Sequence, residues 1–548
     1  MSADETTQDN HQPLYDVAIL GLGPVGCLAA ILLARAGLSV VAVEQDTTVY
    51  KLPRAVNLDA EIVRALQPCG LAEAVDALLQ TVRPGERVGF ANSKREFLFG
   101  TRVADFGANG WQPMNMFDQP ELEGFLREHA LADPRVASYV GYRATAVTQD
   151  ADTAQLSIEP VDDDNPAVES VRARYLLACD GASSFVRRSL QIDWVNLGYD
   201  HDWLVVDVTT KPGHTLELST LQVCDPARIT TYVCTKDPYR RWEFKLNPGE
   251  TWEEMLQPER ISSLLDAWTP RDTYSIRRAA VYQFHAATAA TWRDRRIFIA
   301  GDAAHQTPPF LGQGMNSGMR DVINLAWKLP LVLRGLASPD LLDTYQAERD
   351  AHAHDLVDWA VSLGQLMEHM AAVEAAEQQG RQPPTTRPEL QAAGYGQGRD
   401  QPPLRQGVVI EEQVHNDGTT GFLFSQPIVR RRDASTAQTD MSLSDAAQPD
   451  SEQRLDTLLG DSFCLVGKTA EAITLSEYNH AVLARLGGRV ISLQELEEVR
   501  GHFDRVFAHA DAALVRPDRC IFGHTDEQHS ADDLVHLLAD KLCLQGLD

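Results

Sequence analysis

The sequence predicts an α/β protein in which a mostly parallel sheet carries an inserted antiparallel sheet and is followed by a smaller α/β unit. The first observation is the opening order of apolar run, glycine-rich turn, small-residue helix and second apolar run, which is typical of a β-α-β unit. The second is the alternation of apolar and polar residues over 202–284, which indicates an antiparallel sheet with one buried face. The third is a stretch rich in Pro, Gly and Gln over 378–406, which separates the end of the chain from the rest.

The opening unit is predicted element by element. Residues 16–20 (DVAIL) form a buried strand, residues 24–36 form a helix that Gly37 ends, and residues 39–43 (SVVAV) form the second strand. Two later apolar runs are expected to return to the same sheet: 174–178 and 297–300. Such a unit implies a parallel sheet with a right-handed crossover.

These patterns divide the chain into a tail, a main unit, a linker and a C-terminal unit. The four predicted segments are a polar tail (1–14), the main unit (15–370), the linker (371–406) and the C-terminal unit (407–548). Within the main unit, about 15–200 and 285–370 build the parallel-sheet domain around an insertion at about 201–284.

Composition limits the function classes. A formal net charge of −29 argues against binding to nucleic acid and to anionic membrane surfaces, which need a basic face. No apolar run approaches the roughly 20 residues of a membrane span, and the polar N-terminus does not resemble a signal peptide. Eight cysteines without a CxxC pair, and no clustered Cys or His ligands, favour a cytoplasmic protein with free thiols and no metal site.

The first motif with chemical meaning is Gly21-Leu22-Gly23-Pro24-Val25-Gly26. Its glycines allow a tight turn, close approach of a pyrophosphate and packing of helix against strand, while the helix N-terminus favours the phosphate charge. Glu44 directly follows the second strand, where it can bind a ribose diol. Because strand, helix and acidic residue occur in order, the motif predicts dinucleotide binding and not a chance glycine turn.

The second motif spans 297–316. A strand leads to Gly301-Asp302, and Asp302 at the strand end can hydrogen-bond a ribityl hydroxyl. The glycine-rich stretch 308–316 (PPFLGQGMN) precedes a helix, so its backbone donors could surround a flavin ring edge. A third motif, Asp180-Gly181 after another strand, is by itself equally compatible with a structural turn.

The three motifs, in this order over 15–349, resemble the class A flavoprotein aromatic hydroxylases, the single-component family that includes p-hydroxybenzoate and phenol hydroxylases. Five segments resemble more closely the 3-(3-hydroxyphenyl)propionate hydroxylase group: PRAVNLDAEIVRAL, WLVVDV, CDPARITTYV, RRWEFKLNPGE and GDAAHQTPPFLGQGMNSGMRDVINLAWKL. The segments LDTLLGDSFCLVG and AALVRPD resemble the thioredoxin-like C-terminal domain of that group. The resemblance therefore implies a Rossmann-like FAD-binding domain, an inserted substrate-binding sheet and a thioredoxin-like C-terminal domain that lacks CxxC.

The resemblance also implies cofactors and chemistry. FAD would be reduced by NADH or NADPH, molecular oxygen would form a flavin hydroperoxide, and one oxygen atom would pass to the ortho position of a small phenol. The glycine turn and Glu44 would hold the adenosine half of FAD, Asp302 the ribityl chain, and Gly314 to Asn316 the ring. The predicted FAD-binding residues are Gly21, Gly23, Pro24, Val25, Gly26, Glu44, Arg54, Gln119, Asp180, Gly181, Gly301, Asp302, Pro309, Gly312, Gly314, Met315 and Asn316.

The substrate site is less defined by the sequence. Tyr232, Trp242 and Phe244 lie on the inserted sheet and either line an aromatic pocket or form sheet core. Three arginines are candidates to pair with a substrate carboxylate: Arg228, Arg240 and Arg241. His305 is predicted to make a structural hydrogen bond, and the sequence assigns no acceptor for the phenol proton.

Two other function classes stay open at this point. One is a flavin enzyme that does not hydroxylate, such as a ring reductase or a halogenase, although the WxWxIP segment typical of halogenases is absent. The other is a flavin-binding protein without turnover that docks a partner through its C-terminal unit. The C-terminal unit is expected to be structural or to support a homodimer.

Overall fold

The parallel sheet is built around β1 (Leu14–Leu20), as the opening motif predicts. The computed structural model describes residues 13–81, 85–162, 168–384, 401–432 and 451–544, so most of the predicted tail and residues 385–400 of the predicted linker lie outside it. β1 pairs in parallel with β2 (Val40–Glu44) and β11 (Glu169–Ala178). The sheet continues in parallel through β8 (Val136–Val140) and β18 (Ile297–Ile299), and in antiparallel through β17 (Arg293–Asp294), β10 (Ala154–Pro160) and β9 (Tyr142–Gln149).

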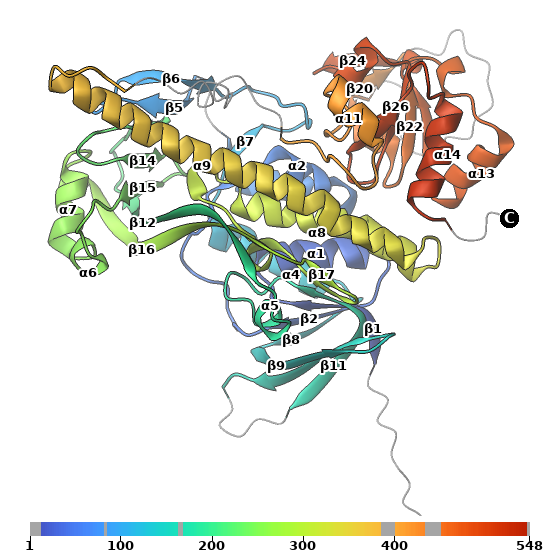
Figure 1. The fold of residues 1–548 in the computed structure, drawn as a ribbon, viewed down its shortest axis with the longest axis horizontal. Coiled ribbons are helices and arrows are strands. Elements are labelled where there is room, and N and C mark those ends of the chain that lie inside the picture. Colours follow the sequence, from blue (N-terminus) through green and yellow to red (C-terminus); the bar gives the residue numbers. More distant parts are fainter. Residues whose placement is uncertain (1–12, 82–84, 163–167, 385–400, 433–450, 545–548) are drawn as a thin grey trace, which may run out of the picture.

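Helices cover this sheet, and their buried sides carry polar and charged residues beside apolar ones. α1 (Pro24–Arg35) makes the crossover from β1 to β2 and packs against α4 (Gln119–Ala132) and α8 (Gly314–Leu333). α9 (Thr344–Gln378) is a long helix that packs on α8 and extends past the insertion sheet (Figure 1). The first residues of the predicted linker, 371–378, are therefore helical.

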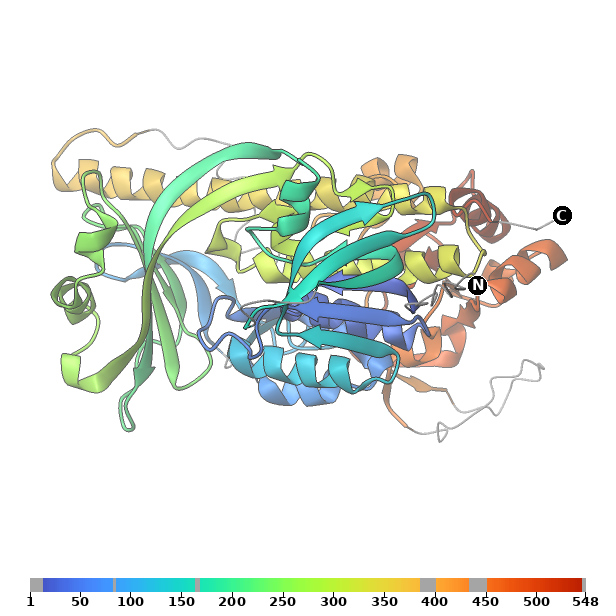
Figure 2. The same ribbon diagram turned by 90° about the horizontal axis from the view of Figure 1, so that it is seen from below.

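A second sheet of eight strands lies beside the first. Its order is β19-β16-β12-β15-β14-β13-β5-β6, and the bounds are β19 (His305–Gln306), β16 (Tyr274–Ala289), β12 (Trp194–Thr210), β15 (Tyr239–Lys245), β14 (Thr230–Val233), β13 (Thr220–Val223), β5 (Arg87–Ala91) and β6 (Phe97–Arg102). β5 and β6 precede the predicted insertion, so the sheet is larger than the sequence pattern indicates. The long strands β12 and β16 pair with each other and curve from this sheet toward the first (Figure 2).

The two faces of the second sheet have different coverings. α6 (Trp252–Met255) and α7 (Pro258–Asp266) cover one face, where an apolar core includes Leu204, Tyr232 and Trp242. The opposite face, which we call the inner face, carries Trp203, Arg241 and Glu243 and contacts segments of the parallel-sheet domain. Smaller elements of the main unit are β3 (Asn57–Asp59), α2 (Ala60–Ala65), α3 (Ala72–Leu78), β4 (Gln80–Thr81), β7 (Met114–Met116) and α5 (Phe185–Ser189).

The C-terminal unit has its own four-stranded sheet in the order β23-β22-β25-β26. Its strands are β22 (Cys464–Gly467), β23 (Arg489–Ser492), β25 (Ala512–Val515) and β26 (Ile521–His524), and its helices are α11 (Glu411–Asp417), α12 (Leu455–Leu459), α13 (Glu477–Arg485) and α14 (Ala531–Lys541). A three-stranded sheet lies beside it, formed by β20 (Ile428–Arg431), β21 (Gln453–Arg454) and β24 (Leu496–Arg500). Trp327 and Leu331 of α8 belong to the core of this unit, so it is docked on the parallel-sheet domain.

Candidate active site

In the glycine turn between β1 and α1, two of the three glycines have no room for a side chain, and the third has open space beside it. A Cβ on Gly26 would lie 1.9 Å from the carbonyl oxygen of Gly21, and a Cβ on Gly21 would lie 2.5 Å from that of Cys179. A Cβ on Gly23 would meet no atom within 4 Å. Gly23 is the N-cap of α1 and gives it no side-chain cap, so the first N–H groups of the helix are available to a phosphate.

Glu44 is buried at the end of β2, where the sequence predicts a ribose contact. Its carboxylate accepts hydrogen bonds from the N–H groups of Leu22 (2.6 Å) and Asp46 (2.8 Å). Arg127, which the sequence analysis missed, lies 3.6 Å from this carboxylate and donates to the Leu22 carbonyl (3.1 Å). A carboxylate accepts about four hydrogen bonds, so Glu44 keeps capacity for a diol.

Gln119 and Arg54, which are both predicted to contact FAD, lie together. The contact between them joins the Gln119 side chain to the backbone of Arg54. The Gln119 carbonyl accepts the N–H groups of Arg54 (3.1 Å) and Ala55 (2.8 Å). Its amide donates to Glu123 (3.2 Å). Gln119 therefore fixes the segment that carries Arg54, whose exposed guanidinium lies over the ring of Tyr50.

A buried ion network supports the Gly301-Asp302 turn. The Asp321 carboxylate accepts from the Gly301 N–H (3.0 Å) and from Arg349 Nε (2.9 Å), and it lies 2.7 Å from His305 Nε2. These side chains are almost fully buried, and Trp292 stacks on His305. The structural hydrogen bond predicted for His305 is confirmed. Sequence reasoning missed Asp321 and Arg349, whose only signal is a charge on the buried side of a helix.

Asp302 itself is not among the hydrogen-bond partners of Asp321 in this network. Its side chain is accessible to solvent, although the surrounding protein atoms raise the pKa of the carboxyl above its ordinary value. Gly301 has φ +62°, a conformation that favours glycine, and Val25 lies 3.4 Å from where its Cβ would be. The Gly301-Asp302 turn thus lies beside the start of α1, which follows the glycine turn.

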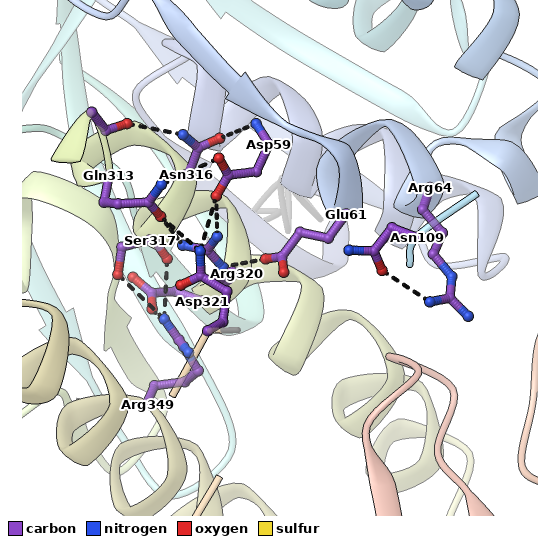
Figure 3. Close-up of polar contacts among 12 residues, drawn as sticks. Asp59, Glu61, Arg64, Asn109, Gln313, Asn316, Ser317, Arg320, Asp321 and Arg349 are labelled. Carbon is purple, nitrogen blue, oxygen red and sulfur yellow. Dashed lines mark hydrogen bonds and ion pairs between the residues drawn. The ribbon is translucent and has the colours of Figure 1, made fainter. Parts of the chain in front are cut away.

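The loop before α8 is tied to β3 by side chains. Asn316 accepts the Asp59 N–H (3.0 Å) and donates to the carbonyls of Asn57 (3.1 Å) and Gly312 (3.0 Å). Arg320 pairs with Asp59 and Glu61 and donates to Gln313 (2.8 Å), as Figure 3 shows. The Asn316 side chain is therefore structural, and the uncapped N-terminus of α8 leaves backbone N–H groups available to a ligand.

Asp180 and Gly181 follow β11 next to the first glycine turn. One Asp180 oxygen accepts the Val186 N–H at the start of α5 (3.1 Å), and the other is buried without a hydrogen-bond partner within the described residues. Burial raises the pKa of this carboxyl. A Cβ on Gly181 would meet no atom within 4 Å, so both residues leave room for a ligand.

The three aromatic residues predicted for the substrate pocket lie elsewhere. Tyr232, Trp242 and Phe244 are at most 2% exposed, and they pack under α6 and α7 on the face opposite the inner face. Strand alternation explains this, because Trp242 and Phe244 share a face of β15 while Arg241 and Glu243 share the other. Their packing corrects the pocket hypothesis in favour of sheet core.

The candidate arginines are already engaged. Arg228 forms a forked ion pair with Glu250, and Arg240 pairs with Asp237 (2.8 Å). Arg241 pairs with Asp207 on the inner face (2.7 Å). None of the three is a free partner for a substrate carboxylate.

The structure also contains a cavity of about 1090 Å³ between α1, α2, α8 and the C-terminal unit. Arg64, Arg320, Trp327 and Arg519 are among its lining residues, and none of the predicted FAD-binding residues lines it. Within the described residues, no group of three or more His, Cys, Asp or Glu side chains could hold a metal ion. No described helix is both long and apolar enough to cross a membrane.

Replacing Asp302 with alanine should weaken FAD binding about 10- to 100-fold, because hydrogen bonds to a charged acceptor contribute about 1.5–3 kcal/mol. The measurement is a fluorescence titration of apoprotein with FAD. Asp302→Asn, which keeps one acceptor, should lose less. An unchanged affinity of the alanine variant for FAD would show that Asp302 does not bind FAD.

Comparison with known proteins agrees with this geometry. Residues 14–360 match the family described as FAD binding domain, and residues 421–541 match the HcaD C-terminal domain. The chain is 33% identical over 470 residues to a 3-(3-hydroxy-phenyl)propionate/3-hydroxycinnamic acid hydroxylase of Klebsiella pneumoniae, covering 83% of this chain and 78% of the relative. The same enzyme of Escherichia coli is 31% identical over 540 residues, covering 93% and 92%.

Solved structures place the whole chain in the same fold. Aklavinone-11 hydroxylase, solved with FAD and aklavinone, superposes with a TM-score of 0.74 at 25% identity, covering 97% of this chain and 99% of that one. The sequence-based expectation of an FAD-binding fold with mixed sheets is thus confirmed. The chain belongs to the FAD-binding-domain family of FAD-dependent aromatic-ring monooxygenases.

Proposed function

We propose that this protein uses NADH or NADPH and molecular oxygen to hydroxylate a phenol at the ortho position, in aromatic catabolism. The substrate is 3-(3-hydroxyphenyl)propionate or a related phenol. The observation that carries this proposal is the convergence of the α1 and α8 N-termini and the Gly301-Asp302 turn beside the inner face of the inserted sheet. The printed activity of the Klebsiella relative supports the substrate class.

The described residues fit four parts of FAD. The open side of Gly23 and the free N–H groups of α1 would hold the pyrophosphate, and Glu44 the adenosine ribose. Asp302 would bind the ribityl chain, and the loop Gly312–Met315 the ring. When bound and reduced, the flavin supplies the activation of oxygen. The protein would orient the phenol on the inner face and exclude water.

The C-terminal unit is proposed to be thioredoxin-like without redox function. Its strand order β23-β22-β25-β26, with β22 and β23 parallel and the others antiparallel, supports the fold. Its cysteines are free, and two of them, Cys464 and Cys520, are buried. Burial raises the pKa of both thiols, which opposes thiolate chemistry.

We further propose that the protein is a cytoplasmic homodimer and binds no nucleic acid. Eight free cysteines are in keeping with the cytoplasm, and a net charge of −29 is in keeping with the absence of nucleic-acid binding.

A panel of phenols tests this function. With purified protein, FAD and either nicotinamide, a substrate should stimulate nicotinamide oxidation and give a product one oxygen atom heavier. Nicotinamide oxidation that yields only hydrogen peroxide with every phenol would favour a non-hydroxylating flavin oxidoreductase. Bound FAD without any stimulated oxidation would favour a flavin-binding partner protein.

A further inference from the structure

The inner face of the second sheet meets the FAD domain at two anchor points. Arg241 of β15 donates to the carbonyls of Arg54 (2.7 Å) and Pro53 (3.2 Å). Trp203 of β12 packs edge-on against Phe310, with ring centroids 5.2 Å apart. Arg54 and the loop that carries Phe310 are both predicted to contact FAD. The stretch of sheet between the anchors therefore faces the proposed position of the flavin ring.

Glu243 lies in this stretch. It is two residues from Arg241 on β15 and so shares the inner face, because side chains alternate along a strand. Lys245, the next residue on that face, is opposite Trp203, which is the second anchor. Glu243 is itself opposite Thr231 of β14. Its carboxyl group thus occupies the centre of the face that a ring substrate would contact.

The other polar groups beside Glu243 are occupied. Asp207 is held by Arg241 (2.7 Å), and the Thr231 hydroxyl donates to Gln222 (2.6 Å). Glu243 is only 4% exposed, yet its carboxylate takes part in no hydrogen bond among the residues that the structure describes; Arg241 is 3.9 Å away. A buried carboxyl group without a donor is costly, so a ligand hydroxyl is the expected partner.

Charges around Glu243 suit an acid–base role. Burial raises the pKa of its carboxyl to about 7, while Arg241 lowers it and Asp207 raises it. Arg278 of β16, 3.9 Å from Asp207, is the next charge on this face. A carboxyl that titrates near neutrality can accept a proton during turnover at physiological pH.

We propose that Glu243 accepts the phenol hydroxyl proton of the substrate, an inference that rests on the proposed function. The O–H bond of the phenol breaks, the proton moves to a carboxylate oxygen of Glu243, and the electron pair stays on the phenol oxygen. No electrons leave the ring in this step. The greater electron density at the ortho carbon then favours its attack on the activated oxygen.

The first test compares Glu243→Gln with Glu254→Gln in the holoenzyme. Glu254 lies in the exposed capping box of α6, which glutamine can maintain, so this control should hydroxylate normally. Glu243→Gln should keep FAD but form product about 10²- to 10⁴-fold more slowly near pH 7. The difference in rate between this variant and the wild type should become smaller as the pH approaches the phenol's own pKa of about 10. Glu243→Asp should restore part of the rate.

The second test measures binding without turnover, from about pH 5.5 to about pH 8.5. The affinity for 3-(3-hydroxyphenyl)propionate should rise through about pH 7 in the wild type and stay flat in Glu243→Gln. The affinity for 3-phenylpropionate, which lacks the hydroxyl, should show no such step in either protein.

Two results would overturn the proton-acceptor role. One is a Glu243→Gln variant with the rate and pH profile of the wild type, and the other is the same pH step in binding for both ligands. A wild type that hydroxylates no phenol would instead overturn the proposed function. The binding comparison would still decide whether Glu243 contacts the hydroxyl.

Discussion

Replacing Gly26 with alanine should destabilise the FAD domain by at least about 3 kcal/mol and abolish FAD retention. The new methyl group would lie 1.9 Å from the Gly21 carbonyl oxygen, and neither backbone segment can move without separating α1 from β1. The measurements are thermal unfolding of the apoprotein and the flavin absorbance that remains after gel filtration.

Gly23→Ala is the matched control. Its methyl group would meet no protein atom within 4 Å, so the apoprotein should unfold at the wild-type temperature. FAD should nevertheless bind more weakly, because the pyrophosphate is expected to approach this position. A Gly26→Ala protein with normal unfolding and full FAD content would refute the packing argument. Normal FAD affinity in Gly23→Ala would show that the pyrophosphate does not bind against this turn.

Replacing Glu348 with alanine should lower the free energy of unfolding by about 3–5 kcal/mol, since buried Lys328 loses its carboxylate partner and buried Arg516 keeps only Asp518. Glu348 of α9 lies 2.9 Å from Lys328 of α8 and 2.8 Å from Arg516 of the C-terminal unit, and all three side chains are fully buried. It also accepts the Val408 N–H (2.9 Å). The measurement is urea unfolding, with loss of the C-terminal unit checked by limited proteolysis.

Low pH should weaken the ion pairs of Glu348 with Lys328 and Arg516. Arg516 and Lys328 hold the pKa of Glu348 at about 2, below its ordinary value of 4.5. The stabilisation is therefore complete above about pH 4.5 and is lost as the pH falls toward 2. Glu411→Gln, at an exposed pair with Lys541, should cost less than about 1 kcal/mol. Equal losses in both variants would contradict a buried clamp between the units.

The sequence predicted the local backbone structure of the candidate site, which neighbouring residues determine. The glycine turn, Glu44 and the Gly301-Asp302 turn belong to short segments in which strand, turn and helix follow one another. The two helices predicted after the glycine-rich motifs, α1 and α8, begin within a few residues of their expected positions, and Gly37 ends α1 with φ +83°. Local order of this kind is encoded by neighbouring residues and needs no tertiary information.

Features that depend on distant contacts could not be predicted. Which face of β15 is core follows from α6 and α7, so Trp242 could not be assigned to a face from its own strand. β5 joins the second sheet by pairing with β13, more than a hundred residues later in the chain. Asp321 and Arg349 come from two helices and meet only under the Gly301 turn. The role proposed for Glu243 depends on the contacts of its sheet with Arg54 and Phe310, which are distant in the sequence.

We expect this protein to insert an oxygen atom from O₂ into a phenol. The most direct measurement is mass spectrometry of the product formed from 3-(3-hydroxyphenyl)propionate under ¹⁸O₂ in ordinary water, with the nicotinamide as reductant. We predict one ¹⁸O atom per product molecule, on the ring carbon next to the original hydroxyl. A product that carries oxygen from water, or no oxygenated product from any phenol tested, would contradict the claim.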